Sequence, residues 1–138
     1  MTVGQILNYN RSIRVIIDNS PDMNALVKYR LLGMLKQFEP AMQNYEEVRN
    51  DLIKKYGTVN ESGNIGIYYP QEEDYGDKKR YEEAVKEHEE IVEKFDTALE
   101  EILNSESDIV VNKFKYTDIM NAGLSTDYLV VLYDLIEE

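Results

Sequence analysis

Residues 83–93 contain pairs of glutamates whose spacing could support metal binding or acid–base catalysis. Glu83 and Glu87, and likewise Glu89 and Glu93, stand four residues apart, so each pair shares one face of a helix. Paired carboxylates bind divalent cations or divide the roles of general acid and general base. These pairs, however, belong to a chain with 27 acidic residues, and they lack the spacing of a calcium-binding loop. A solvated acidic face is therefore the plainer interpretation.

His88 is the only histidine of the chain, and it lies between Ala84 and Ile91 at helical spacing. A glutamate next to it in sequence does not face it, because adjacent residues of a helix point in different directions. The second histidine of the zinc-protease pattern is missing, as are a phosphate-binding loop, a dinucleotide fingerprint and a nucleophile elbow. We therefore predict no catalytic residue, no cofactor and no metal site, in a protein that is not an enzyme.

Tyrosines are concentrated in one part of the chain, since five of the eleven lie between residues 56 and 81. Tyrosine offers a large contact area with a polar tip and is enriched at binding surfaces. Tyr56 and Tyr81 fit a helical seam, which leaves Tyr68, Tyr69 and Tyr75 as candidate partner contacts. The alternative is that these three rings pack the connecting segment onto the helices.

Two long stretches with heptad spacing must position these side chains. The alternation of gaps of three and four residues keeps one seam of a helix facing a partner helix. The first seam consists of Leu31, Leu35, Phe38, Met42, Tyr45, Arg49, Leu52 and Tyr56. The second consists of Tyr81, Ala84, His88, Ile91, Phe95, Ala98 and Ile102. We predict a mainly α fold, in one helical domain over residues 1–138, built on a long antiparallel helical hairpin of residues 21–56 and 77–104.

Capping signals give the ends of the first two helices. Thr2 and Gln5 have the spacing of a capping box, which predicts an N-terminal helix over residues 3–18. Ser20 as cap and Pro21 as first residue predict the start of the second helix. Pro40 removes one backbone hydrogen bond from that helix. Because the seam stays in phase on both sides of Pro40, we favour a kinked helix over two separate helices.

The remaining segments are shorter. A hairpin-like turn at residues 61–64 allows a small β-hairpin within residues 58–68, and a mobile loop is the alternative interpretation. Residues 109–115 are rich in β-branched and aromatic side chains, which predicts a minor β element there. Ser125 or Thr126 can cap a last helix that runs toward the C-terminus.

Charge and composition exclude several classes of function. The net charge is −12, and residues 71–108 hold fifteen acidic and five basic residues. This surface repels phosphate, so we expect no direct binding to nucleic acid. No apolar run approaches about 20 residues, so we expect no membrane span. The chain has no cysteine and no signal-peptide pattern at its start, from which we expect a protein that works inside a cell.

Several motifs follow one another in a characteristic order. They are Asn19-Ser20-Pro21, Phe38-Glu39-Pro40-Ala41, Tyr45-Glu46-Glu47-Val48-Arg49, Leu52-Ile53-Lys54-Lys55-Tyr56-Gly57, Asn60-Glu61-Ser62-Gly63-Asn64, Ile109-Val110-Val111 and Gly123-Leu124-Ser125-Thr126-Asp127-Tyr128-Leu129. In this order the chain resembles a family of small acidic proteins of unknown function from tailed bacteriophages and prophages. The resemblance implies a phage origin. It implies no activity and no site residues, and the segment from Tyr68 to Tyr75 has no counterpart in it.

We expect a non-enzymatic protein-binding module of phage type, which acts through the helical hairpin and its tyrosine-rich tip. Its partner would be a protein of the host or of the phage, and a second copy of the chain would also fit the seam. We expect it in the cytoplasm of an infected bacterial host or associated with the virion.

Two other functions fit the same sequence. One is a counter-defence inhibitor whose acidic helix imitates nucleic acid and occupies the basic channel of a host enzyme. Its contact residues would be Glu83, Glu87, Glu90 and Glu93. The other is a virion or assembly component that is present in many copies.

Overall fold

The computed structural model of the chain describes residues 1–137 and is mainly helical. The helices are α1 (Val3–Asp18), α2 (Ala25–Tyr56), α3 (Lys78–Leu103), α4 (Tyr116–Met120) and α5 (Thr126–Val131), with 3-10 turns η1 (Glu72–Asp74) and η2 (Tyr133–Leu135). A two-stranded antiparallel sheet joins β1 (Thr58–Val59) and β2 (Ile65–Gly66). The predicted fold class is therefore confirmed.

Two compact units divide the chain, and α2 contributes to both. The first unit contains Met1–Gln43 and the chain from Ser105 onward, and the second unit is Asn44–Asn104. The prediction of one domain over residues 1–138 stays a prediction. None of the helices in residues 1–137 is both long enough and apolar enough to cross a bilayer.

Side-chain caps set the starts of α1 and α2. At α1 the predicted capping box is confirmed, with the Gln5 amide donating to Thr2 Oγ1 at 3.2 Å and the Thr2 amide donating to Gln5 Oε1 at 2.9 Å. The predicted start of the second helix at Pro21 is wrong. Asn24 Oδ1 accepts the amides of Leu26 and Val27 at 3.0 and 3.3 Å, so the helix begins at Ala25 and residues 21–24 form a turn.

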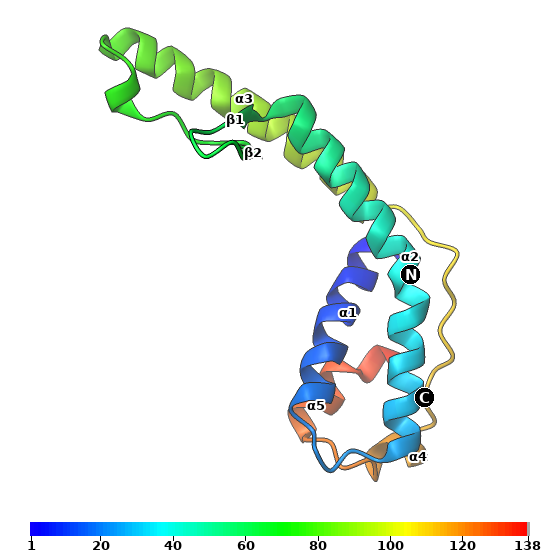
Figure 1. The fold of residues 1–138 in the computed structure, drawn as a ribbon. Coiled ribbons are helices and arrows are strands. Elements are labelled where there is room, and N and C mark those ends of the chain that lie inside the picture. The colour runs from blue at the N-terminus through cyan, green and yellow to red at the C-terminus, as the bar shows by residue number, and fades with distance from the viewer. Residues whose placement is uncertain (138) are drawn as a thin grey trace. The chain divides into compact units, whose positions relative to one another are not determined.

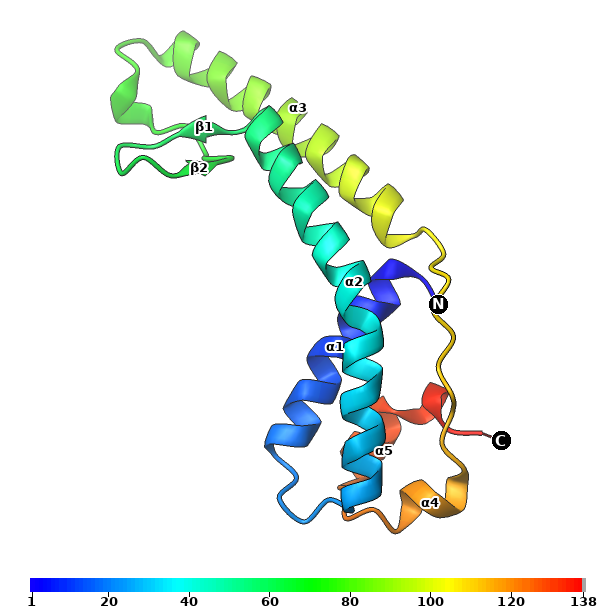
Figure 2. The ribbon, with the colours of Figure 1, turned by 45° about the vertical axis from the view of Figure 1, so that its right-hand side comes forward.

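The first unit is built around a core to which α1, α2 and the C-terminal region contribute. Figures 1 and 2 show α1 alongside the first part of α2. Three of the eight residues of the predicted first seam are buried here, because Leu31, Leu35 and Phe38 belong to this core. The partners of these three residues include Ile6, Ile13 and Ile16 of α1 and Phe114, Ile119, Leu132 and Leu135 near the C-terminus. Each such side chain contributes roughly 1.5–3 kcal/mol by leaving water.

The C-terminal region differs from the prediction in two ways. The prediction of a β element at residues 109–115 is wrong as to a strand, because Phe114 makes only an isolated bridge to Ile136 and Val110 is 81% exposed. Phe114 is instead fixed by burial beneath the Arg30 guanidinium, 4.1 Å from the ring centroid. The short helix α4 was not predicted. The cap at Ser125 is confirmed, since its Oγ accepts the Tyr128 amide at 3.4 Å, and α5 ends after six residues.

In the second unit, the last part of α2 and α3 lie side by side and run in opposite directions (Figures 1 and 2). All seven predicted seam residues of α3 are half-buried, whereas the glutamates beside them are exposed. On α2, Tyr45, Leu52 and Tyr56 are half-buried and Arg49 is exposed. The helix α2 continues through Pro40, so the alternative of two separate helices is wrong.

Gly123 has a left-handed backbone conformation, and its contribution to stability can be measured with a substitution. Its φ is +76°, and an added Cβ would collide with the backbone carbonyl of Asp22. We expect Gly123→Ala to lower the free energy of unfolding by about 1–3 kcal/mol.

The matched control is Gly33→Ala, in the middle of α2, where an added Cβ meets nothing within 4 Å. Because alanine is the better helix former by about 1 kcal/mol, this variant should be as stable as the parent protein or more stable. Urea denaturation followed by circular dichroism measures both. Equal midpoints for the two variants would contradict the assignment of the turn at Gly123.

Candidate functional site

The connecting segment, residues 57–77, folds into a β-hairpin followed by η1, so the hairpin interpretation is confirmed. Thr58 pairs with Gly66 and Val59 with Ile65. Asn60 closes the turn: its Oδ1 accepts the amides of Ser62 at 3.0 Å and Asn64 at 2.9 Å. Gly63 completes the turn at a φ of +81°, a conformation that residues with a Cβ rarely adopt.

Tyr68 is held by the hairpin itself. Its hydroxyl donates to the Asn64 carbonyl at 3.2 Å, and its ring lies against Gly66. The side chain nevertheless remains 44% exposed. The hairpin therefore fixes the orientation of the ring without covering it.

Tyr69 and Tyr75 attach the connecting segment to α3. The Tyr69 ring meets the His88 ring edge to face, with centroids 5.2 Å apart and planes at 75°. Tyr75 meets Tyr81 with centroids 6.0 Å apart. Such pairs contribute about 0.5–1.5 kcal/mol beyond burial. Tyr69 is still 54% exposed and Tyr75 36%. The rings of Tyr69 and Tyr75 thus pack onto α3 and also face solvent, and a role of the three tyrosines as partner contacts stays a prediction.

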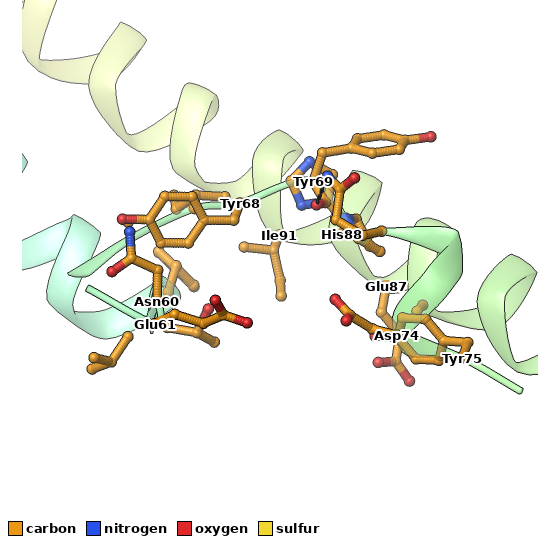
Figure 3. A pocket seen from close by; sticks show the side chains of 17 residues that line it. Asn60, Glu61, Tyr68, Tyr69, Asp74, Tyr75, Glu87, His88 and Ile91 are labelled. Atoms are coloured by element: carbon orange, nitrogen blue, oxygen red, sulfur yellow. Dashed lines mark hydrogen bonds between the residues drawn. The ribbon is translucent and has the colours of Figure 1, made fainter. Parts of the chain in front are cut away.

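A cleft of about 580 Å³ lies between the connecting segment and α3. Its aromatic lining consists of Tyr56, Tyr68, Tyr69 and Tyr75, together with His88. The apolar lining includes Val59, Ile67, Pro70, Ala84 and Ile91, and the acidic lining is Glu61, Asp74 and Glu87. Figure 3 shows Glu61 across an open space from Asp74 and Glu87, with Ile91 between them and Tyr68 and Tyr69 above.

The structure brings some of the predicted site residues together and separates others. Tyr68, Tyr69, Tyr75 and Glu87 all line the cleft. The other three predicted residues are exposed on α3 outside the cleft lining: Glu83, Glu90 and Glu93. Glu90 and Glu93 border a shallow groove beside Tyr56.

Sequence reasoning missed Glu61 and Asp74. Glu61 lies in the hairpin turn, which the sequence did indicate, but nothing in the sequence shows that this turn folds back over α3. Asp74 lies in η1, a single 3-10 turn without a side-chain cap, and such a turn leaves little signal. His88 was recognised as a seam residue, and the structure shows that its ring also contacts Tyr69.

The cleft offers aromatic, apolar and carboxylate groups to a ligand. Within residues 1–137, no group of three or more His, Asp or Glu side chains is arranged to hold a metal ion. Partial burial, the neighbouring Tyr69 hydroxyl and the Glu72 carboxylate raise the pKa of Tyr81 above 10.0, in that order of effect. Tyr81 therefore stays a neutral phenol at neutral pH.

Comparisons with protein-family models, with curated proteins and with solved structures find no match. No relative therefore bears on the role of the cleft.

The effect of Tyr69 on the pKa of Tyr81 can be tested by substitution. Tyr69→Phe removes the hydroxyl that helps to raise the pKa of Tyr81, so that pKa should fall toward 10.0. It should remain above 10.0, because partial burial and Glu72 still act on Tyr81. Titration of ¹³Cζ-labelled tyrosine by NMR measures this directly. An unchanged Tyr81 titration in the variant would show that Tyr69 does not lie beside it.

Proposed function

We propose that the protein is a non-enzymatic protein-binding module of phage type, and that its partner docks on the cleft of the second unit. The observation that carries the proposal is the distribution of exposed apolar side chains. In the second unit, the exposed large hydrophobic residues are Val48 on α2 and five in the connecting segment, namely Val59, Ile65, Tyr68, Tyr69 and Tyr75. Exposed apolar surface gathered in one place is typical of an interaction site.

The aromatic residues of the cleft support binding to a protein. Tyrosine is over-represented among the residues that dominate interface energies, and it is effective where its orientation is already fixed. Tyr68, Tyr69 and Tyr75 each have such a fixed orientation, through the Asn64 carbonyl, the His88 ring and the Tyr81 ring. A partner would therefore lose little entropy in ordering these side chains.

The non-enzymatic part of the proposal rests on the composition of the cleft. Its lining contains tyrosines, carboxylates, amides and apolar groups, and His88 presents its ring to Tyr69. The phage part rests on the resemblance described above. The proposed location is the cytoplasm of an infected bacterial host or the virion.

The acidic-helix inhibitor is the second candidate, because one observation favours it. Glu83, Glu90 and Glu93 are exposed on α3 outside the cleft lining, as an imitation of phosphates would require. Apart from Glu87, which both candidates would use, the two candidates use different residues, so one experiment separates them.

That experiment is partner capture from a lysate of infected bacterial cells, quantified by mass spectrometry. We expect Tyr68→Ala/Tyr69→Ala to lose most of the captured partner, because the variant removes two rings of the docking surface and the Tyr69–His88 contact that holds the connecting segment on α3. The melting temperature should change little, because both side chains are about half exposed and lie outside the buried core. The control, Tyr29→Ala/Tyr133→Ala, removes two tyrosines that are 74% and 67% exposed in the first unit, and it should capture normally.

A third variant, Glu83→Gln/Glu90→Gln/Glu93→Gln, should also capture normally. If this variant loses the partner while the tyrosine variant keeps it, the inhibitor is the correct function and the proposed docking site is wrong.

A further inference from the structure

The cleft has a one-sided charge that indicates the chemistry of its partner. Its lining holds three carboxylates, those of Glu61, Asp74 and Glu87, and no lysine or arginine. The second unit as a whole has seventeen acidic and eight basic residues, a balance of −9. A concave surface lined by one sign of charge concentrates its field and attracts the opposite sign.

The three carboxylates are available to a partner. They come from three different elements: the hairpin turn, η1 and α3. All three residues are exposed, and no ion pair joins any of them to another side chain in the described chain, residues 1–137. Figure 3 shows Glu61 on one side of the open space, and Asp74 and Glu87 together on the other side. A cation that enters between them would therefore meet carboxylates on two sides.

The rest of the lining suits an arginine better than a simple ammonium ion. The guanidinium group is planar, stacks on aromatic faces and donates two parallel hydrogen bonds to one carboxylate. The tyrosines supply the aromatic surface. Ile67, Pro70 and Ile91 supply apolar surface for the methylene groups of the side chain.

We propose that the cleft binds an arginine-bearing segment of the partner protein, with the guanidinium group between Glu61 and the carboxylates of Asp74 and Glu87. This inference rests on the proposed function, since it names the chemistry of the segment that docks there. It also gives the exposed tyrosines a specific role, which is to stack on the cation and cover its methylene groups.

The test uses defined peptides and the full-length protein. A fluorescein-labelled octapeptide with two arginines is titrated by fluorescence anisotropy at 150 mM salt. The comparison peptides carry lysine or citrulline in place of arginine. Citrulline keeps the shape of the side chain and removes its charge. We expect the arginine peptide to bind most tightly, the lysine peptide more weakly and the citrulline peptide at least about tenfold more weakly than arginine.

Two charge-matched variants show whether binding occurs in the cleft. Glu61→Gln/Asp74→Asn/Glu87→Gln should weaken the arginine peptide about tenfold or more. The control, Glu46→Gln/Glu47→Gln/Glu101→Gln, removes the same charge from exposed positions of the second unit outside the cleft lining. Because long-range attraction is screened at this salt concentration, the control should weaken binding by less than about threefold.

Several outcomes would overturn the inference. Equal loss in both variants would assign binding to the general acidity of the surface, and equal affinity for citrulline would exclude recognition of a cation. If no peptide binds, but Tyr68→Ala/Tyr69→Ala still abolishes partner capture, the arginine inference fails and the proposed docking site stands. If the arginine peptide binds in the cleft, but the tyrosine variant still captures the partner, the proposed function fails instead.

Discussion

The contact between the Tyr69 ring and the His88 ring fixes the connecting segment on α3, and the cleft depends on it. The β-hairpin has strands of only two residues each, and an isolated two-stranded hairpin is marginally stable in water. Edge-to-face contact with His88, followed by the contact of Tyr75 with Tyr81, fastens the chain on both sides of η1. Without these two contacts, the tyrosines and carboxylates of the segment would have no fixed position relative to α3.

The seam of α3 therefore makes two kinds of contact. Along most of its length it presents half-buried apolar residues beside α2, and at Tyr81 and His88 it receives the rings of the connecting segment. This explains why a polar aromatic residue stands in an otherwise apolar seam. The acidic residues of α3 stay on its exposed side, with the exception that Glu87 also reaches the cleft.

The regular helices could be predicted from the sequence because their signals are local and repeated. The capping box at Thr2 and the spacing from Tyr81 to Ile102 depend only on residues within a few turns of one another.

The start of α2 could not be predicted, because Ser20-Pro21 and Asn24 offer competing caps. The Asn24 amide also donates to the Ala122 carbonyl at 2.7 Å, a contact between distant parts of the chain. Burial of Phe114 beneath Arg30 likewise depends on distant residues, and it overrides the strand preference of residues 109–115. The clustering of tyrosines in the connecting segment could be read from the sequence. The positions of Glu61 and Asp74 in the cleft could not, because they depend on how the segment packs on α3.

An aromatic NOESY spectrum of the free protein, with labelled tyrosine and histidine, tests whether the connecting segment is held on α3. The rings of Tyr69 and His88 lie with centroids 5.2 Å apart, and the rings of Tyr75 and Tyr81 6.0 Å apart. We expect cross-peaks between the ring protons of both pairs, together with ring-current shifts at His88. Random-coil shifts for Tyr69 and Tyr75, without cross-peaks to α3, would contradict the existence of an ordered cleft.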